Sequence, residues 1–102
     1  LIDKERDYFM DLLRELMKNI CSANTIHITN KEEYYMRRNY QTQAICNCEN
    51  LLQEMQYIIC VCHPNVEKYM VYVDIIEKEI VLLKGWRKSD NKIFKELDKE
   101  KG

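Results

Sequence analysis

The chain has 102 residues and carries 16 lysines and arginines against 17 aspartates and glutamates, for a net charge of −1. A chain of this length forms one domain with a modest core, and its near-neutral charge provides no global attraction for nucleic acid. The two glycines and the single proline predict long helices joined by short turns, and therefore an all-α fold. We expect residues 1–102 to form one helical-bundle domain.

Adjacent apolar pairs recur every four positions in the first part of the chain, from Tyr8 and Phe9 to Ile20 and Cys21. This spacing places a broad apolar face along one helix of about 20 residues. Asp3 is the expected N-cap of this helix.

The stretch SANTIHITN interrupts that period before the second helix. Thr29 and Glu32 then match the S/T-x-x-E pattern, in which a side chain and the backbone cap each other, so a helix is expected to start near Asn30. From there a heptad seam predicts one long helix over residues 31–62. The seam positions are Gln41, Ala44, Cys48, Leu51, Met55, Ile58 and Cys62.

The residues His63, Pro64 and Asn65 predict a tight turn, because proline disfavours helical geometry in the preceding residue and Asn65 can cap a new helix. The third helix repeats a seam of apolar residues, and the short connection makes this helix antiparallel to the second. Its seam positions are Val66, Tyr69, Val73, Ile76, Ile80 and Leu83.

Gly85 is the expected end of the third helix, with Trp86 packing back on the glycine cap. Ser89 or Asp90 would then cap a short fourth helix over the apolar residues that follow. A continuous helix through Gly85 is the alternative. The predicted architecture is an up-and-down bundle of three long helices plus a short fourth, that is, a four-helix bundle.

The five cysteines, at positions 21, 46, 48, 60 and 62, fit no closed disulfide set, and no apolar signal segment precedes them. We therefore expect a cytoplasmic protein whose cysteines are reduced and pack as small apolar groups. Positions two apart on a helix point in opposite directions, so neither C-x-C pair chelates a metal from a regular helix. Cys60, Cys62 and His63 stay open as a zinc-binding alternative, but no metal or other cofactor is predicted.

Catalytic motifs are missing from the sequence, which has no Gly-rich phosphate loop, no G-x-S-x-G and no H-E-x-x-H. His27 and His63 have no sequence-local acid or nucleophile, so we predict no catalytic residue and no enzymatic activity. No stretch reaches the roughly 18 unbroken apolar residues of a membrane-spanning helix, so no membrane partner is expected.

Basic residues concentrate in LLKGWRKSDNK, residues 82–92, beside the only tryptophan. A second basic pair lies among tyrosines in EEYYMRRNYQTQ, and such interleaving suits phosphate binding by arginine and stacking on bases. In an antiparallel helix pair these two stretches approach each other and form one patch of about six positive charges. The predicted contact residues are Arg37, Arg38, Lys84, Trp86, Arg87, Lys88 and Lys92, with Trp86 as the anchor.

The segments RRNYQTQAICNCENLL and EKEIVLLKGWRKSDNKI resemble the bacterial four-helix-bundle family that includes the accessory variability determinant protein of diversity-generating retroelements. The resemblance covers residues 31–93. It implies a homopentamer that binds a reverse transcriptase and its template RNA, or an RNA/DNA hybrid, and so supports mutagenic cDNA synthesis. By matching position, the resemblance assigns nucleic-acid contacts to Arg37, Arg38, Arg87 and Lys88.

A helical-bundle module that binds or regulates a protein partner without contacting nucleic acid is the alternative function. Its apolar helix faces would bind the partner, and the basic segment would contribute only solubility. The net charge of −1 differs from the strongly basic members of the family and favours binding to a partner protein.

Overall fold

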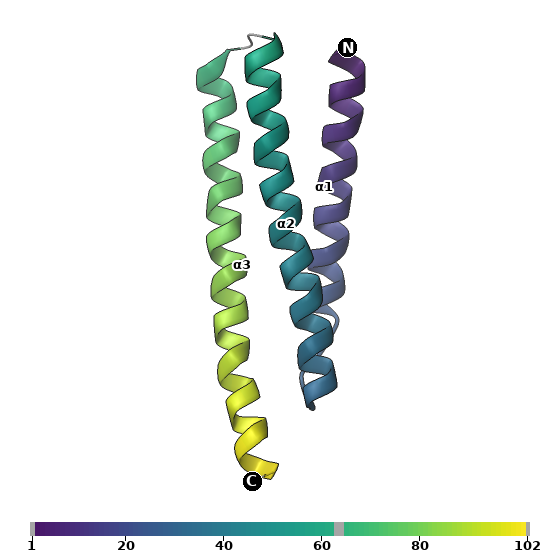
Figure 1. Ribbon diagram of the computed structural model, residues 1–102, viewed down its shortest axis with the longest axis vertical. Coiled ribbons are helices and arrows are strands. Elements are labelled where there is room, and N and C mark those ends of the chain that lie inside the picture. Colours follow the sequence, from purple (N-terminus) through teal and green to yellow (C-terminus); the bar gives the residue numbers. More distant parts are fainter. Residues whose placement is uncertain (1, 63–64, 102) are drawn as a thin grey trace.

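The structure is a computed structural model that describes residues 2–62 and 65–101, with the side chains of residues 4–62 and 65–99. It consists of three long helices, α1 (Ile2–Asn24), α2 (Lys31–Cys62) and α3 (Val66–Lys101). Helix α2 runs antiparallel to α1 and α3 and lies between them, so the helices form an up-and-down layer (Figure 1). The all-α prediction is confirmed. None of the described helices is long and apolar enough to cross a membrane.

In the N-terminal cap of α2, the acidic residue lies one position later than the sequence pattern predicts. Asn30 Oδ1 accepts a hydrogen bond from the Glu33 backbone N–H at 2.9 Å, and Glu33 Oε1 accepts one from the Thr29 backbone N–H at 2.9 Å. The Thr29 hydroxyl donates to the same carboxylate oxygen, and these two bonds from Thr29 lower the pKa of Glu33. The acidic residue of the capping box is therefore Glu33 rather than Glu32, with Asn30 at the N-cap position.

The starts of α1 and α3 differ in how well they match their predicted caps. Helix α1 begins at Ile2, so Asp3 lies inside the helix instead of capping it. His63 and Pro64, which were expected to end the second helix, lie outside the described residues. Asn65 directly precedes α3, and its carbonyl accepts a hydrogen bond from the Tyr69 backbone N–H at 3.4 Å, as an N-cap carbonyl does.

Helix α3 continues through Gly85 to Lys101, so the predicted stop and the short fourth helix are wrong and the continuous alternative is confirmed. A Cβ placed at Gly85 would meet no atom within 4 Å beyond its own helix backbone. Glycine in a helix costs about 1 kcal/mol relative to alanine. Tertiary contacts offset this cost, because the continuous helix brings Trp86, Asp90 and Phe94 against the core and the start of α2.

The core follows the seams predicted for the second and third helices. The buried seam side chains are Gln41, Ala44, Cys48, Leu51 and Met55 on α2, and Ile76 and Leu83 on α3. Helix α1 contributes Leu16, and further apolar residues of all three helices pack partly buried around this cluster. The prediction is thus confirmed for the middle of both seams, whereas Val66, the first residue of α3, is half exposed.

The three helices form an open layer rather than a closed bundle. Helices α1 and α3 each pack on α2, and among the described residues no Cα of α1 lies within 8 Å of a Cα of α3. The layer measures 58 × 21 × 15 Å, with a radius of gyration of 16.9 Å. A compact domain of this length has a radius of gyration of about 13 Å, so this fold leaves an unusual share of its helix surfaces uncovered.

Candidate nucleic-acid interface

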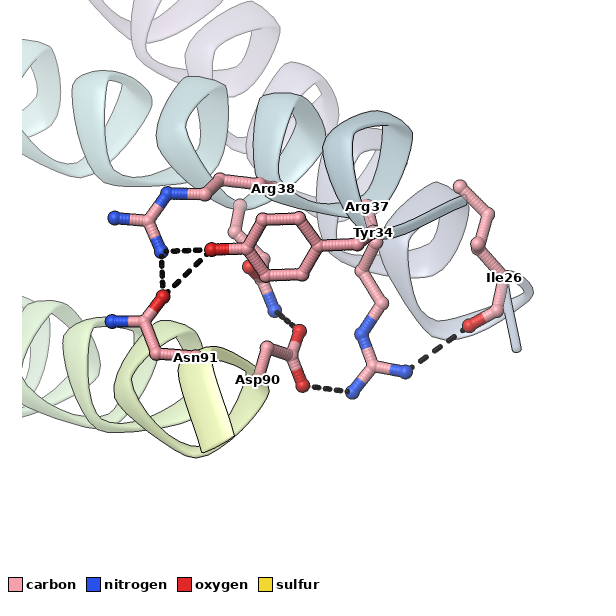
Figure 2. A network of polar contacts seen from close by, with 7 residues as sticks. Ile26, Tyr34, Arg37, Arg38, Asp90 and Asn91 are labelled. Atoms are coloured by element: carbon pink, nitrogen blue, oxygen red, sulfur yellow. Dashed lines mark hydrogen bonds and ion pairs between the residues drawn. The ribbon is translucent and has the colours of Figure 1, made fainter. Parts of the chain in front are cut away.

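The first turns of α2 lie beside the second half of α3, and a buried carboxylate joins them (Figure 2). The Asp90 side chain is 2% exposed, and it accepts one hydrogen bond from Arg37 Nη2 and one from Gln41 Nε2, each at 2.9 Å. Arg37 Nη1 donates to the carbonyl of Ile26, in the connection between α1 and α2, at 3.1 Å. The Arg37 guanidinium also lies 4.8 Å from the centroid of the Trp86 ring. We call these five residues the Asp90 network.

A second polar cluster adjoins the Asp90 network, as Figure 2 shows. Asn91 Oδ1 accepts hydrogen bonds from the Tyr34 hydroxyl and from Arg38 Nη1, each at 2.7 Å. Arg38 Nη1 also donates to the Tyr34 hydroxyl oxygen at 3.2 Å. The Phe94 ring packs on Tyr34 with 4.6 Å between centroids. Arg38 therefore joins α2 to α3, as Arg37 does.

Arg87, the single arginine of residues 82–92, also contacts α2. Arg87 Nη1 donates to Thr42 Oγ1 at 3.3 Å, while its Nε is buried and has no hydrogen-bond partner among the described residues. The planar guanidinium suits this role, because it makes directed hydrogen bonds along a helix surface while its stem packs on apolar atoms.

The lysines of the same stretch point to water. Lys84, Lys88 and Lys92 occupy successive turns of α3, and all three are exposed. Ion pairs to Asp or Glu are found for Lys31 and Lys78 in the described part of the chain, but none is found for these three lysines. We call Lys84, Lys88 and Lys92 the lysine edge. Its charges are free to meet an anionic partner.

The two basic stretches of the sequence thus meet, as antiparallel packing predicts, but their charges divide into two groups. The Arg37 guanidinium is paired with the Asp90 carboxylate, whereas Arg38 donates to the neutral side chains of Asn91 and Tyr34 and keeps its charge. The single patch of about six positive charges stays a prediction. Trp86 packs against the core and against Arg37 rather than back on a glycine cap, because α3 continues through Gly85. The binding role of each of these residues stays a prediction.

Sequence reasoning missed Asp90 and Gln41 as a buried polar pair. Asp90 was interpreted as a possible cap of a fourth helix, and Gln41 as one of the apolar seam positions. The heptad spacing of the two seams indicates this pair, because Asp90 follows Leu83 by seven residues and Gln41 precedes Cys48 by seven. Extending the α3 heptad by one repeat places the Asp90 carboxylate opposite the Gln41 amide in the core, where each requires a hydrogen-bond partner.

The five cysteines are free thiols, and Cys48 is the buried one. Cys48 is buried, and this burial, followed by the charges of Glu79 and Glu49, raises the pKa of its thiol to about 11. At neutral pH a thiol with so high a pKa is almost entirely protonated and is therefore a weak nucleophile. The described residues contain no group of three or more His, Cys, Asp or Glu that could hold a metal ion, and His63 of the zinc-binding alternative lies outside them.

A groove opens at the other end of the layer, between α1, the end of α2 and the start of α3. It has a volume of about 600 Å³, and its charged lining consists of Glu5 and Arg6 on α1. The other lining residues are Phe9, Met55, Ile58, Cys62, Tyr69 and Tyr72. We call it the open groove. Its α2 side consists of seam positions, of which Met55 is buried and Ile58 and Cys62 are partly buried.

Comparisons with protein-family models, with curated proteins and with solved structures find no match for this chain.

Proposed function

We propose that this chain is a non-enzymatic accessory protein that contacts a reverse transcriptase and its template RNA in the cytoplasm. The resemblance to the accessory variability determinant family suggests this role, and the lysine edge is the observation that supports it. All five cysteines are free thiols, in keeping with a reducing compartment.

The lysine edge suits the backbone of a nucleic acid. Three ammonium groups on successive turns of a rigid helix follow a line of phosphates, and lysine binds phosphate as a point charge. Three such contacts give a modest affinity with a clear salt dependence. For single-stranded RNA, the slope of log affinity against log salt would be about −2.

The test is RNA binding by the purified full chain, with Lys84, Lys88 and Lys92 changed together to glutamate. We expect this variant to lose about tenfold or more in affinity, and its remaining binding to depend little on salt. The control changes Lys18, Lys68 and Lys78, three exposed lysines elsewhere on the surface, to glutamate. Equal losses in both variants, or wild-type binding that does not change with salt, would contradict the proposal.

Arg37 and Arg38 are unsuitable for this test. Their guanidinium groups join α2 to α3, so their replacement would alter the fold together with any contact to RNA. The resemblance assigns nucleic-acid contacts to both, and that assignment is best tested by crosslinking of the intact wild-type chain to RNA.

A protein-binding module without nucleic-acid contact is the second candidate, and the exposed apolar surface of the layer favours it. Val71, Val81 and Leu82 on α3 are all more than half exposed. Surfaces of this kind mark protein interfaces. Capture of a co-expressed reverse transcriptase after nuclease treatment separates the candidates, because binding through RNA is lost and binding through protein persists.

A further inference from the structure

The open groove has the size and the lining of a small-molecule site. Its volume of about 600 Å³ lies within the range of about 300 to 1,000 Å³ that such sites occupy. Three of its lining side chains are aromatic, Phe9 on α1 and Tyr69 and Tyr72 on α3. The two tyrosine rings meet edge to face, with 6.2 Å between their centroids. Walls of this kind, with few charged groups, are typical of sites that enclose the body of an organic ligand.

A pair of carboxyl groups lies on the α1 side of the groove. Glu5 lines the groove, and its side chain is hydrogen-bonded to that of Glu54 on α2. Glu54 directly precedes Met55 and lies about one turn before Ile58, and both of these residues line the groove. Glu54 Oε1 is buried and has no hydrogen-bond partner among the described residues. The carboxyl pair therefore has an acceptor that the described part of the chain leaves unsatisfied.

The electrostatic balance of this pair favours a positive charge. Burial, followed by the hydrogen bond and the charge of Glu5, raises the pKa of Glu54 to about 7. Two neighbouring carboxyl groups repel each other once both are ionised, and a cation placed beside them offsets this repulsion. Arg6, the cation among the described lining residues, already interacts with another part of the chain. Its charge is therefore not left over for an anionic ligand.

We propose that the open groove binds an organic cation, a molecule with an apolar body and one ammonium group. The body would lie against Phe9, Tyr69 and Tyr72, and the ammonium group would lie at Glu5. The aromatic side chains add to this preference, because their ring faces attract cations. An ammonium group also has three N–H donors, whereas ionised carboxyl groups only accept hydrogen bonds. A ligand carboxylate in the same place would instead be repelled by two acids.

This inference goes beyond the proposed function and does not depend on it. The groove lies at the start of α3, whereas the lysine edge of Lys84, Lys88 and Lys92 lies in the second half of that helix. RNA binding and cation binding are measured on the same chain with different ligands. Either proposal can therefore fail while the other holds.

The experiment is isothermal titration calorimetry of the purified full chain with three probes that share one apolar body. The probes are phenylbutylamine, phenylbutanol and phenylbutyrate, which are cationic, neutral and anionic. The titrations are made at pH 8, above the pKa of Glu54, where the amine still carries its charge. We expect the amine to bind about tenfold tighter than the alcohol, and the butyrate to bind more weakly than the alcohol.

Two variants and a control locate the cation in the groove. Glu5→Gln should weaken binding of the amine about tenfold and leave binding of the alcohol unchanged, because the amide keeps the size of the side chain and removes its charge. Tyr72→Leu should weaken binding of the amine about threefold through loss of the aromatic face. Glu15→Gln, at an exposed position about 15 Å further along α1, should bind all three probes as wild type does. Circular dichroism should show the same helical content in every variant.

Equal affinities for the amine and the alcohol would overturn the proposal, because the groove would then select apolar surface alone, such as the side chains of a partner protein. Tighter binding of the butyrate would also overturn it and would identify Arg6 as the charge that selects the ligand. Amine binding that Glu5→Gln leaves unchanged, or no binding of any probe, would contradict it as well. A chain that prefers the amine but does not bind RNA would contradict the proposed function alone.

Discussion

At one end of the molecule, the start of α2 meets the second half of α3 through paired polar groups. At the other end, the three helices line a groove whose side chains are mostly apolar. The Asp90 carboxylate receives two hydrogen bonds, and one of its donors is also bonded to the connection between α1 and α2. The open groove is instead lined mainly by apolar side chains, with Glu5 and Arg6 as its charged lining residues.

The polar contacts make the alignment of α3 against α2 specific, whereas the apolar contacts contribute buried surface. A buried carboxylate requires both of its partners, so only one register of α3 against α2 satisfies Asp90, Arg37 and Gln41 together. Apolar side chains accept several registers and several partners at similar free energy. We infer that the polar end determines how the helices are aligned, while the apolar end leaves apolar helix surface uncovered.

The largest effect on stability is expected from Asp90→Ala, which removes the buried carboxylate between α2 and α3. The substitution leaves the Arg37 guanidinium, whose side chain is 17% exposed, without its carboxylate, and Gln41 without its acceptor. Breaking such a pair costs about 3 kcal/mol in the free energy of unfolding. Urea denaturation at a constant protein concentration measures this loss.

Asp74→Ala is the matched control for Asp90→Ala. Asp74 pairs with Lys78 on the same helix at 3.0 Å, but both side chains are more than half exposed. Its loss should change the free energy of unfolding by less than about 0.5 kcal/mol. Equal effects of the two substitutions would show that the Asp90 network does not stabilise the alignment of α2 and α3.

The apolar end should respond to pH through Glu54 on α2. Burial, followed by the hydrogen bond and the charge of Glu5, raises the pKa of Glu54 to about 7. The folded chain therefore binds this proton more tightly than the unfolded chain, whose carboxyl has the ordinary pKa of 4.5. Stability is greatest below this lower pKa and falls as the pH rises through about 7.

Glu54→Gln should remove that decline, because the amide mimics the protonated carboxyl at every pH. We expect the variant to be more stable than wild type by about 1 kcal/mol at pH 8 and equal to it at pH 4, since water screens part of the effect. Urea denaturation at both pH values measures the difference, with the exposed Glu49→Gln as control. An identical pH dependence in wild type and Glu54→Gln would show that Glu54 is ionised in the folded chain at neutral pH.

The helices could be predicted from the sequence because their signals are local. The seam of α2 and its bounds follow from the heptad spacing and from the residues near Asn30. The continuity of α3 could not be read locally, because glycine is common at helix ends and the sequence around Gly85 allows both outcomes. Contacts of Trp86 and Asp90 with the core and with α2 decide for the continuous helix.

The site was predictable in its position but not in its chemistry. Antiparallel packing places Arg37 near the basic stretch of α3, as the sequence indicates. Whether an arginine contacts water or a buried acid depends on the side chain opposite. Predicting which side chain lies opposite requires the register of the two helices. Asp90 lies among four basic residues in the sequence, and this position is typical of a surface charge. In the fold, however, the Asp90 side chain is buried.

The smallest effect is expected at Gly85, where α3 passes from the apolar end to the polar end. Gly85→Ala should stabilise the chain by about 0.5 to 1 kcal/mol, because alanine loses less backbone entropy in a helix and its Cβ meets open space. Ser89→Ala, at an exposed position of the same helix, should stabilise it by less than this amount. Urea denaturation of both variants measures the difference. Destabilisation by Gly85→Ala would mean that the helix bends at this glycine in solution. The contacts of Asp90 would then not determine how the part of α3 before Gly85 is aligned with α2.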